Sequence, residues 1–331
     1  MKVAIVGASG LIGHKMLEVL EEKNFAIDEL ILCASRASVG KEIRFRGRQH
    51  HLVSVEDAIA SRPDIAIFSA GSEASLLYAP IFAKQGCYVI DNSSAWRMKK
   101  EIPLVVPEIN ADTITADTKI IANPNCSTIQ MVVALAPLHD KFGIRRIVVS
   151  TYQSVSGSGM RGIQQLGCEE KGESSEHPIY PHQIYRNVIP HGGTFNDDGY
   201  TTEEQKLVDE TRKILRAPQI AVSATVARVP VTGGHSESVN VEFDNEFTLD
   251  EVQQLIANTN GVVLCDDPHH NIYPTAITAY NKNEVFVGRL RRDSSIKNGL
   301  NLWIVSDNTR KGAATNAVQI AEYITKNIIK K

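Results

Sequence analysis

The most constraining feature of the sequence is an apolar run at residues 3–6 that ends in three evenly spaced glycines, Gly7, Gly10 and Gly13. A continuous, largely β-branched run is typical of a parallel strand buried on both faces. The apolar residues that follow have helical spacing. Glycines at such a strand-to-helix turn allow a diphosphate to approach the backbone and the first helical N–H groups. The spacing is GxxGxxG rather than GxGxxG, so a plain tight turn remains an alternative.

Further short apolar runs at 30–34, 65–68 and 88–90, with a helical stretch at 76–84, predict an open, mostly parallel sheet. Ligands of such sheets bind beyond the carboxyl ends of the strands, so the polar loops that follow the runs should face cofactor and substrate. The second run ends in Ser35, Arg36, Ala37 and Ser38 without an acidic residue. Hydroxyls and an arginine suit the 2′-phosphate of NADP, although a solvated basic loop is the alternative.

Composition indicates a small ligand rather than a macromolecular one. A chain of 331 residues is long enough for two domains. It has 35 Lys and Arg against 38 Asp and Glu, a net charge of −3, which argues against a nucleic-acid-binding surface. The longest uncharged stretch, 120–138, is interrupted by polar residues and does not suit a membrane span. We expect a small-molecule partner, no nucleic acid and no membrane.

The five cysteines lie far apart, with no CxxC pair and no zinc-like clustering with histidine. This pattern argues against a disulfide framework and a metal site, and it favours a cytoplasmic enzyme. Cys33, Cys87 and Cys265 are typical of small buried side chains. Cys126 differs because it follows Asn125 in a polar turn between an apolar strand and the helical stretch 129–138. A thiol in the first helical turn is favoured as the nucleophilic thiolate.

A thiolate nucleophile normally works with a histidine that takes and returns a proton. Of ten histidines, His50, His51, His269 and His270 lie in polar segments that suit a solvated surface. His235 follows two glycines between two strand-like runs, which gives the backbone room to present the imidazole. It is the candidate base, with a structural role as the alternative.

Taken together, these segments resemble aspartate-β-semialdehyde dehydrogenase, in its shorter bacterial form. The matching stretches run through nearly the whole chain in the same order: GASGLIG at 7–13, DNSSAWRM at 91–98, VPEIN at 106–110, NPNCST at 123–128, TYQSVSGSG at 151–159, RVPVTGGHSES at 228–238 and DNTRKGAATNAVQIAE at 307–322.

The resemblance implies NADPH-dependent reduction of L-aspartyl 4-phosphate to L-aspartate 4-semialdehyde and inorganic phosphate through a cysteine thioester. This step belongs to the biosynthesis of lysine, threonine, methionine and diaminopimelate. By the same resemblance the catalytic residues are Cys126 as nucleophile, His235 as acid/base catalyst and Gln153, which orients the substrate.

The resemblance also assigns residues to the anionic substrate. Arg228 would pair with the α-carboxylate, Glu203 would bind the ammonium, and Arg97, Lys206 and the amide of Asn125 would handle phosphate. A surface ion pair between Glu203 and Lys206 is the alternative. Thr201 and Glu204 have the spacing of a helix capping box, which makes Glu204 structural.

For the cofactor, the resemblance implies NADP. Its binding residues would come from the glycine turn, the loops after the next three strands, the segment after Gln153 and the terminal helix. They are Gly7, Ser9, Gly10, Leu11, Ile12, Gly13, Ser35, Arg36, Ala37, Ser38, Gly71, Asn92, Ser156, Gly157 and Asn316. One departure is that the family usually has SxRS after the second strand, whereas Arg36 here comes one place earlier. Another is Gly192-Gly193 in place of a bulkier pair, for which the sequence suggests no function.

The predicted fold class is α/β. A Rossmann-like, NADP-binding domain covers residues 1–126 and is joined by a C-terminal helix at about 306–331. An α+β catalytic and dimerisation domain with a large mixed sheet covers 127–305. Such sheets form a dimer surface in the family, so we expect a homodimer, with a tetramer as the alternative.

Three other functions compete. N-acetyl-γ-glutamyl-phosphate reductase shares the chemistry, but its cysteine is followed by Tyr-Pro, whereas Ser127 and Thr128 follow Cys126. Phosphorylating glyceraldehyde-3-phosphate dehydrogenase also forms a thioester, yet its cysteine-region pattern is absent. A non-catalytic, cofactor-binding homologue is the third, and the presence of Cys126, Gln153, Arg228 and His235 in one chain argues against it.

Overall fold

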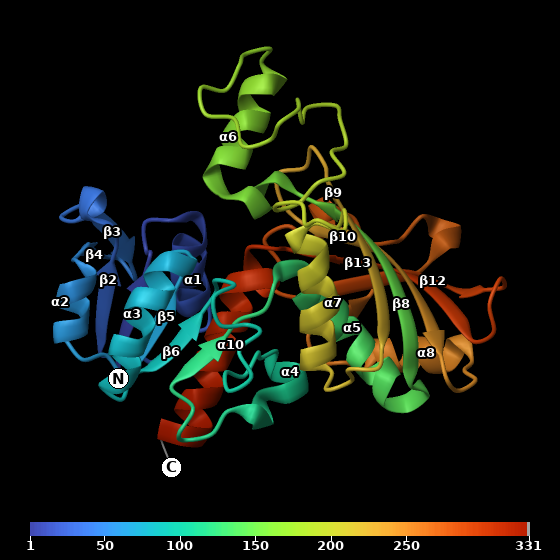
Figure 1. Ribbon diagram of the computed structural model, residues 1–331, viewed down its shortest axis with the longest axis horizontal. Coiled ribbons are helices and arrows are strands. Elements are labelled where there is room, and N and C mark those ends of the chain that lie inside the picture. Colours follow the sequence, from blue (N-terminus) through green and yellow to red (C-terminus); the bar gives the residue numbers. More distant parts are fainter. Residues whose placement is uncertain (330–331) are drawn as a thin grey trace. The chain divides into compact units, whose positions relative to one another are not determined.

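The computed structural model describes residues 1–329, which form two compact units (Figure 1). The first unit contains Met1–Asn125 and the chain from Ala313 onward, and the second is Cys126–Gly312. From the sequence these boundaries are expected at 126 and at about 305. The chain therefore enters the second unit at Cys126.

The first unit is built on a five-stranded, wholly parallel sheet with the order β2-β1-β5-β6-β7. The strands predicted at 3–6, 30–34, 65–68 and 88–90 are confirmed. Their observed bounds are β1 (Lys2–Val6), β2 (Glu29–Cys33), β5 (Ile65–Phe68) and β6 (Tyr88–Asp91), and β7 (Ile120–Ala122) completes the edge. This sheet and the mixed sheet of the second unit confirm the predicted fold class.

Helices cover both faces of this sheet because side chains alternate along each strand. Val3 and Ile5 of β1 pack in a core with α1 (Leu11–Glu22) and α10 (Thr315–Ile324). Ala4 and Val6 point to the other face, where α2 (Val55–Ala60) and α3 (Ser72–Lys84) pack (Figure 1). Every strand of a sheet covered on both sides must be apolar throughout, which is what made these strands recognisable.

A β-hairpin in the first unit was not predicted. It consists of β3 (Glu42–Phe45) and β4 (Arg48–His51), joined at Arg46 and Gly47, both with positive φ. Only Ile43 and Phe45 of its residues are apolar, so it lacks the continuous apolar pattern of a strand buried on both faces. The remaining short elements of this unit are the 3-10 turn η1 (Arg36–Ser38), α4 (Pro107–Asn110) and η2 (Ala111–Thr113).

The second unit contains a six-stranded mixed sheet with the order β11-β12-β13-β10-β8-β9. Only the outer pairs, β11 with β12 and β8 with β9, are parallel. The strands are β8 (Ile144–Gln153), β9 (Ala221–Arg228), β10 (His235–Phe243), β11 (Val262–Leu264), β12 (Val285–Asp293) and β13 (Gly299–Ser306).

One face of this sheet is covered by α5 (Cys126–Phe142), which contacts β8, β10, β12 and β13 and is flanked by α7 (Thr202–Ile214) and α8 (Leu249–Ala257) (Figure 1). Its residues are buried nearly all round, in keeping with its continuous apolar sequence. The other helices of this unit are η3 (Val155–Ser158), α6 (Gly159–Glu170), η4 (Pro268–His270) and α9 (Ala276–Ala279). Two π-helical segments, η5 (Arg310–Ala314) and η6 (Thr325–Ile329), flank α10 of the first unit. Among residues 1–329, no helix is both long and apolar enough to cross a membrane.

Candidate active site

The predicted cofactor residues of the first unit gather at one edge of its sheet. The strands are parallel, so the segments that follow them leave at the same edge. Residues 7–13 follow β1, residues 35–38 follow β2, Gly71 follows β5 and Asn92 follows β6. The strand order reverses between β1 and β5, the position at which open parallel sheets bind dinucleotides.

The glycine turn is shaped for close backbone approach. Gly7 has a φ of 91°, and a Cβ there would lie 2.4 Å from the carbonyl oxygen of Ser69. A Cβ at Gly13 would lie 2.4 Å from the carbonyl oxygen of Gly7. Gly10 precedes α1 without a side-chain cap, and Ser9 and Gly10 are exposed. The start of this 12-residue helix therefore offers backbone N–H groups to a diphosphate.

The loops that follow β2 and β5 expose several of the predicted cofactor residues to solvent. Ser35, Arg36 and Ala37 are exposed at the end of β2. Gly71 has a φ of 84°, and its α-carbon faces open space at the start of α3. These positions are accessible to a ligand from solvent.

Asn92 and Asn316 instead belong to a network of hydrogen-bonded amides. Asn92 donates to the carbonyl oxygen of Phe68 at 2.8 Å and accepts from Asn123 Nδ2 at 2.8 Å. The fully buried Asn316 donates to Asn123 Oδ1 at 2.7 Å and to the carbonyl oxygen of Val105 at 2.9 Å. Their side-chain nitrogens thus hold the loops that follow β6 and β7.

Arg97 and Asn125, the phosphate candidates of the first unit, are both buried. Arg97 Nη2 donates to the carbonyl oxygen of Asn92 at 2.8 Å. Burial raises the pKa of Asp91 at the end of β6, and the positive charge of Arg97 partly offsets this effect. Arg97 is therefore anchored beside the same edge of the sheet.

In the second unit, Gln153, Arg228 and His235 form a row across three neighbouring strands. Gln153 ends β8 and is the register partner of Arg228, which ends β9. His235 begins β10, one residue before the Ser236–Tyr152 pair with β8. All three are buried on the face that α5 covers. Because β10 runs antiparallel to β8 and β9, its first residue, His235, lies at the level at which β8 and β9 end.

Cys126 starts α5, as the sequence predicts. Its neighbour Ser127 accepts a hydrogen bond of 2.9 Å from Gln153 Nε2, which ties the helix start to the row. A Cβ at Gly312 would lie 2.8 Å from the Cβ of Cys126, so only glycine fits beside the thiol. The aligned peptide dipoles at this helix start favour the thiolate.

His235 is completely buried, and its two ring nitrogens have different surroundings. Nδ1 lies 3.1 Å from the backbone nitrogen of Ser154, which donates to it. Nε2 is buried without a hydrogen-bond partner among the described residues. Burial, followed by the positive charge of Arg228, lowers the pKa of His235 to about 3, against an opposing effect of Glu203. The resting imidazole is therefore neutral.

Arg228 and His235 converge on Gly157. A Cβ there would lie 2.6 Å from Arg228 Nη1 and 3.1 Å from His235 Nε2. Arg228 Nη1 donates to the carbonyl oxygen of Ser154 at 2.9 Å, and its buried Nε has no partner among the described residues. Gly157 thus keeps open the space that a cationic fork and an imidazole N–H both face.

Glu203 and Lys206 lie in the first turns of α7 and form an ion pair with an Nζ–Oε2 distance of 2.8 Å. Gly192 packs against this turn, since a Cβ there would lie 3.3 Å from Glu203 Cβ. The predicted capping box is confirmed. Glu204 accepts from the backbone of Thr201 at 2.7 Å and, through its other oxygen, from Val226 of β9 at 3.0 Å. Glu204 is therefore structural, whereas the Glu203 side chain is paired with Lys206.

Four residues near this row were not predicted: Ser127, Ser154, Asn308 and Gly312. Each lies inside or next to a stretch that carries the family resemblance, but a hydroxyl, an amide or a glycine has no chemical signature of its own. Their importance comes from strand register and from contacts across the fold, which the sequence does not display.

The other thiols have different environments from Cys126. Cys33 and Cys87 are buried as predicted, and burial raises the pKa of both, that of Cys33 to about 12. Cys265 is only half-buried, because it follows the short β11, so the prediction of a buried side chain is wrong there. Within residues 1–329, no group of three or more His, Cys, Asp or Glu is placed to hold a metal ion.

Comparison with known proteins agrees with both units. Residues 2–116 match the family described as semialdehyde dehydrogenase, NAD binding domain, and residues 135–311 match semialdehyde dehydrogenase, dimerisation domain. Fold and site together define an oxidoreductase with one dinucleotide-binding unit and a second unit that carries the buried histidine and the cysteine at a helix start.

The relatives specify the family. The chain is 51% identical to an aspartate-semialdehyde dehydrogenase of Aquifex aeolicus over 98% of both chains, and 48% identical to that of Legionella pneumophila over 100% of this chain and 97% of the relative. A crystal structure of aspartate semialdehyde dehydrogenase II from Vibrio cholerae, complexed with ASA, superposes with a TM-score of 0.95 at 47% identity and covers 98% of each chain. The chain belongs to the aspartate-semialdehyde dehydrogenase family.

Proposed function

We propose that the protein reduces L-aspartyl 4-phosphate to L-aspartate 4-semialdehyde with NADPH and releases phosphate, a step in lysine, threonine, methionine and diaminopimelate biosynthesis. The observation that carries this proposal is the row of Gln153, Arg228 and His235 beside the helix start at Cys126. The names of the relatives and the ASA complex of the Vibrio cholerae structure support the same substrate.

Cys126 is the nucleophile in this proposal. Its thiolate attacks the carbonyl carbon of the acyl phosphate, the bond from that carbon to the phosphate oxygen breaks, and phosphate leaves with the electron pair. The product is a thioester on Cys126. Gln153 holds the start of α5 through Ser127 and orients the substrate, while His235 supplies acid–base catalysis to the oxygen of the reacting carbonyl.

The cofactor would be held by the first unit. The turn at 7–13 suits the diphosphate, because its glycines and the open start of α1 leave backbone donors accessible. Ser35, Arg36 and Ser38 suit a 2′-phosphate, since no acidic residue follows β2. Ser156 and Gly157 would line the nicotinamide side, and NADPH supplies the hydride that reduces the thioester to the aldehyde.

Charge complementarity supports the choice of a free amino acid. Arg228 presents a buried fork suited to the α-carboxylate, and Glu203 is placed for the ammonium. Lys206, with Arg97 and Asn125, would bind phosphate. In the absence of a ligand Glu203 and Lys206 neutralise each other, and a zwitterionic acyl phosphate offers each a partner of opposite charge.

The test is a steady-state assay in the direction of aldehyde oxidation. With L-aspartate 4-semialdehyde, phosphate and NADP, the chain should reduce the cofactor, and Cys126→Ala should abolish this. N-acetyl-L-glutamate 5-semialdehyde should be a poor substrate, since its acetylated nitrogen offers no charge to Glu203. Preference for the acetylated aldehyde, or turnover by Cys126→Ala, would contradict the proposal, and cofactor binding without any turnover would favour a non-catalytic homologue.

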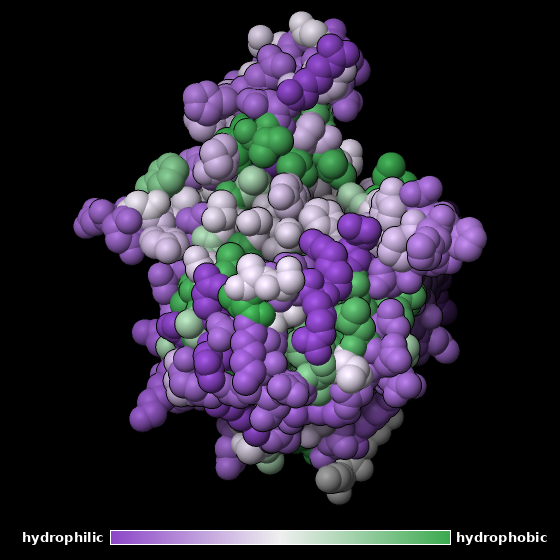
Figure 2. All heavy atoms as spheres, turned by 90° about the vertical axis from the view of Figure 1, so that its right-hand side faces the viewer, coloured by the Kyte–Doolittle hydropathy of each residue, from purple (hydrophilic) through white to green (hydrophobic). Residues whose placement is uncertain are grey.

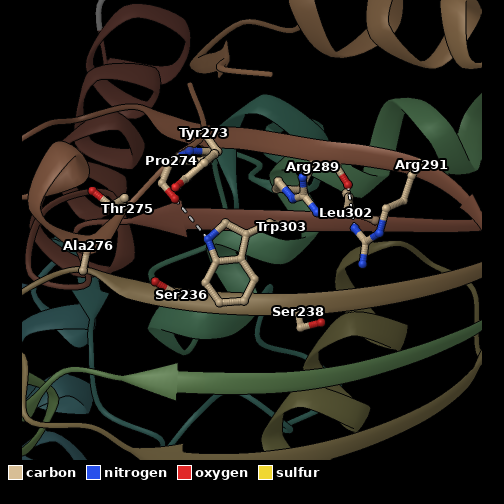
Figure 3. A pocket seen from close by; sticks show the side chains of 10 residues that line it. All are labelled: Ser236, Ser238, Tyr273, Pro274, Thr275, Ala276, Arg289, Arg291, Leu302 and Trp303. Atoms are coloured by element: carbon tan, nitrogen blue, oxygen red, sulfur yellow. Dashed lines mark hydrogen bonds between the residues drawn. The ribbon is translucent and has the colours of Figure 1, made fainter. Parts of the chain in front are cut away.

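We also propose a homodimer formed through the sheet of the second unit, in keeping with the family match over 135–311. The face opposite α5 exposes Tyr152 of β8, whose ring lies 5.5 Å from that of Trp303 of β13. Beside Trp303 is a cavity of about 550 Å³ (Figure 3). The view from the right-hand side of Figure 1 shows hydrophobic residues, in green, as patches among hydrophilic ones, in purple (Figure 2). The cavity opens on the face opposite His235, since Ser236 and Ser238 alternate with His235 along β10, so it is separate from the catalytic row.

The cytoplasm is the proposed compartment. All five cysteines are free thiols in the structure, and their pattern fits a reducing environment.

Size-exclusion chromatography with light scattering measures the dimer directly, and a monomer at micromolar concentration would contradict that part of the proposal.

A further inference from the structure

The turn from β8 into η3 brings Ser154 against the ring of His235. Ser154 follows the last residue of β8, and its backbone N–H donates to His235 Nδ1 at 3.1 Å. Its hydroxyl oxygen lies 3.0 Å from the same nitrogen. Both residues are fully buried. Nδ1 therefore has two groups of Ser154 as neighbours and no access to solvent.

A backbone N–H can only donate, so Nδ1 must accept and cannot carry a proton in the neutral ring. The single proton of the neutral imidazole is then on Nε2. Nε2 has no partner among the described residues, and it faces the space above Gly157, where a Cβ would lie 3.1 Å away. The ring N–H thus points to the space that Arg228 also faces, 2.6 Å from the same Cβ position.

Asn308 holds Ser154 in this position. The Ser154 hydroxyl donates to Asn308 Oδ1 at 2.9 Å, and the backbone N–H of Gly234, next to His235, donates to the same oxygen at 3.3 Å. Asn308 Nδ2 donates to the hydroxyl of Ser156 at 3.0 Å. One buried amide therefore ties the segment at 154–156 to the residue before His235.

We propose that Ser154 and Asn308 are positioning residues that hold His235 neutral, with its proton on Nε2, so that it enters the reaction as a hydrogen-bond donor. The inference rests on the proposed function. In the tetrahedral intermediate on Cys126 the former carbonyl oxygen becomes anionic, and the His235 Nε2–H stabilises it. In this arrangement the free His235 does not remove the proton of Cys126, because Nε2 is already protonated and Nδ1 accepts from Ser154.

The charged and titratable groups around His235 favour the neutral ring. The positive charge of Arg228 on β9 disfavours protonation of the His235 ring, and the negative charge of Glu203 on α7 favours it with a smaller effect. Asp307 follows Ser306, the register partner of His235, but its carboxylate is bound by its own turn, including Thr309. On α5, Cys126 is the titratable group at the helix start.

The direct test is ¹⁵N NMR of protein labelled at histidine, with the His235 signals assigned by their loss in His235→Asn. The wild-type ring should be neutral and protonated at Nε2 across about pH 5.5–8.5. A proton on Nδ1, or an imidazolium at pH 7, would overturn the proposal. This measurement needs no turnover, so it remains informative if the proposed substrate is wrong.

Variants separate positioning from structure. Ser154→Ala keeps the backbone donor to Nδ1, so the proton should stay on Nε2, but it loses the hydroxyl link to Asn308, so kcat should fall about tenfold with an unchanged KM for NADP. The matched control is Thr151→Val, which removes a buried hydroxyl of the same strand that has no hydrogen-bond partner among the described residues. Equal kcat values for the two variants would refute a role for the Ser154 hydroxyl.

Asn308→Asp adds a negative charge at constant shape and should favour the imidazolium. An ionisation near the ordinary histidine pKa of about 6.5 should then appear in the kcat–pH profile, with activity lost on the acidic side. A profile identical to that of the wild type would count against the assignment of Asn308.

Discussion

The contact between Gly157, Arg228 and His235 gives the most quantitative prediction. In Gly157→Ala the new Cβ would lie 2.6 Å from Arg228 Nη1, about 0.8 Å inside ordinary van der Waals contact, which begins at 3.4 Å. The guanidinium is buried and bound to the carbonyl oxygen of Ser154, so it cannot simply swing into solvent. Gly157 does not have a positive φ, so alanine introduces no backbone strain there.

A displacement approaching 1 Å at a substrate-orienting group costs on the order of 10²-fold in rate. We therefore expect kcat/KM for L-aspartate 4-semialdehyde to fall about 10²-fold in Gly157→Ala, equivalent to roughly 2.7 kcal/mol of transition-state stabilisation. Steady-state kinetics at saturating NADP and phosphate measure this loss. The matched control is Gly167→Ala in α6, where a Cβ meets no atom within 4 Å. A kcat/KM within twofold of the wild type for Gly157→Ala would refute the convergence of Arg228 and His235 on this space.

Three further predictions test other parts of the structure. Thr201→Ala removes the capping hydroxyl of α7 and should lower the free energy of unfolding by about 1 kcal/mol in urea denaturation, and an unchanged value would contradict the role of the cap. Burial raises the pKa of Glu237 well above its usual 4.5, so above that pH the native state keeps a proton that the unfolded chain loses, and stability falls as pH rises. Glu237→Gln cannot ionise and should therefore gain stability over the wild type at pH 8 more than at pH 5, whereas equal differences at the two pH values would argue against a buried neutral acid. Arg36→Ala should reduce the preference for NADP over NAD roughly tenfold in kcat/KM, and an unchanged ratio would remove Arg36 from the 2′-phosphate site.

The parallel sheet of the first unit could be predicted from the sequence because burial on both faces leaves a continuous apolar signal. The strand predicted at residues 65–68 has the same bounds as the observed β5 (Ile65–Phe68). The β3–β4 hairpin could not be predicted, since Ile43 and Phe45 are the only apolar residues of its two short strands and its pairing depends on the turn at Arg46 and Gly47.

The site divides in a similar way. Cys126 and His235 could be predicted because a thiol at a helix start and an imidazole after two glycines are chemically distinctive residues in distinctive places. Ser154 and Asn308 could not, because their effect on His235 depends on the register of β8 with β10 and on a turn more than 150 residues away in the chain. Side chains that react are visible in a sequence, whereas the polar groups that orient them become visible only in the fold.

A single-turnover experiment without phosphate detects the proposed thioester on Cys126. On mixing with L-aspartate 4-semialdehyde and NADP, the chain should produce a burst of about one NADPH per active site and then stop, because no phosphate is present to release the acyl group. Mass spectrometry of the quenched protein should find the aspartyl adduct on the peptide that contains Cys126, and added phosphate should restore turnover. The absence of a burst, or an adduct on any other residue, would contradict the role of Cys126 as nucleophile.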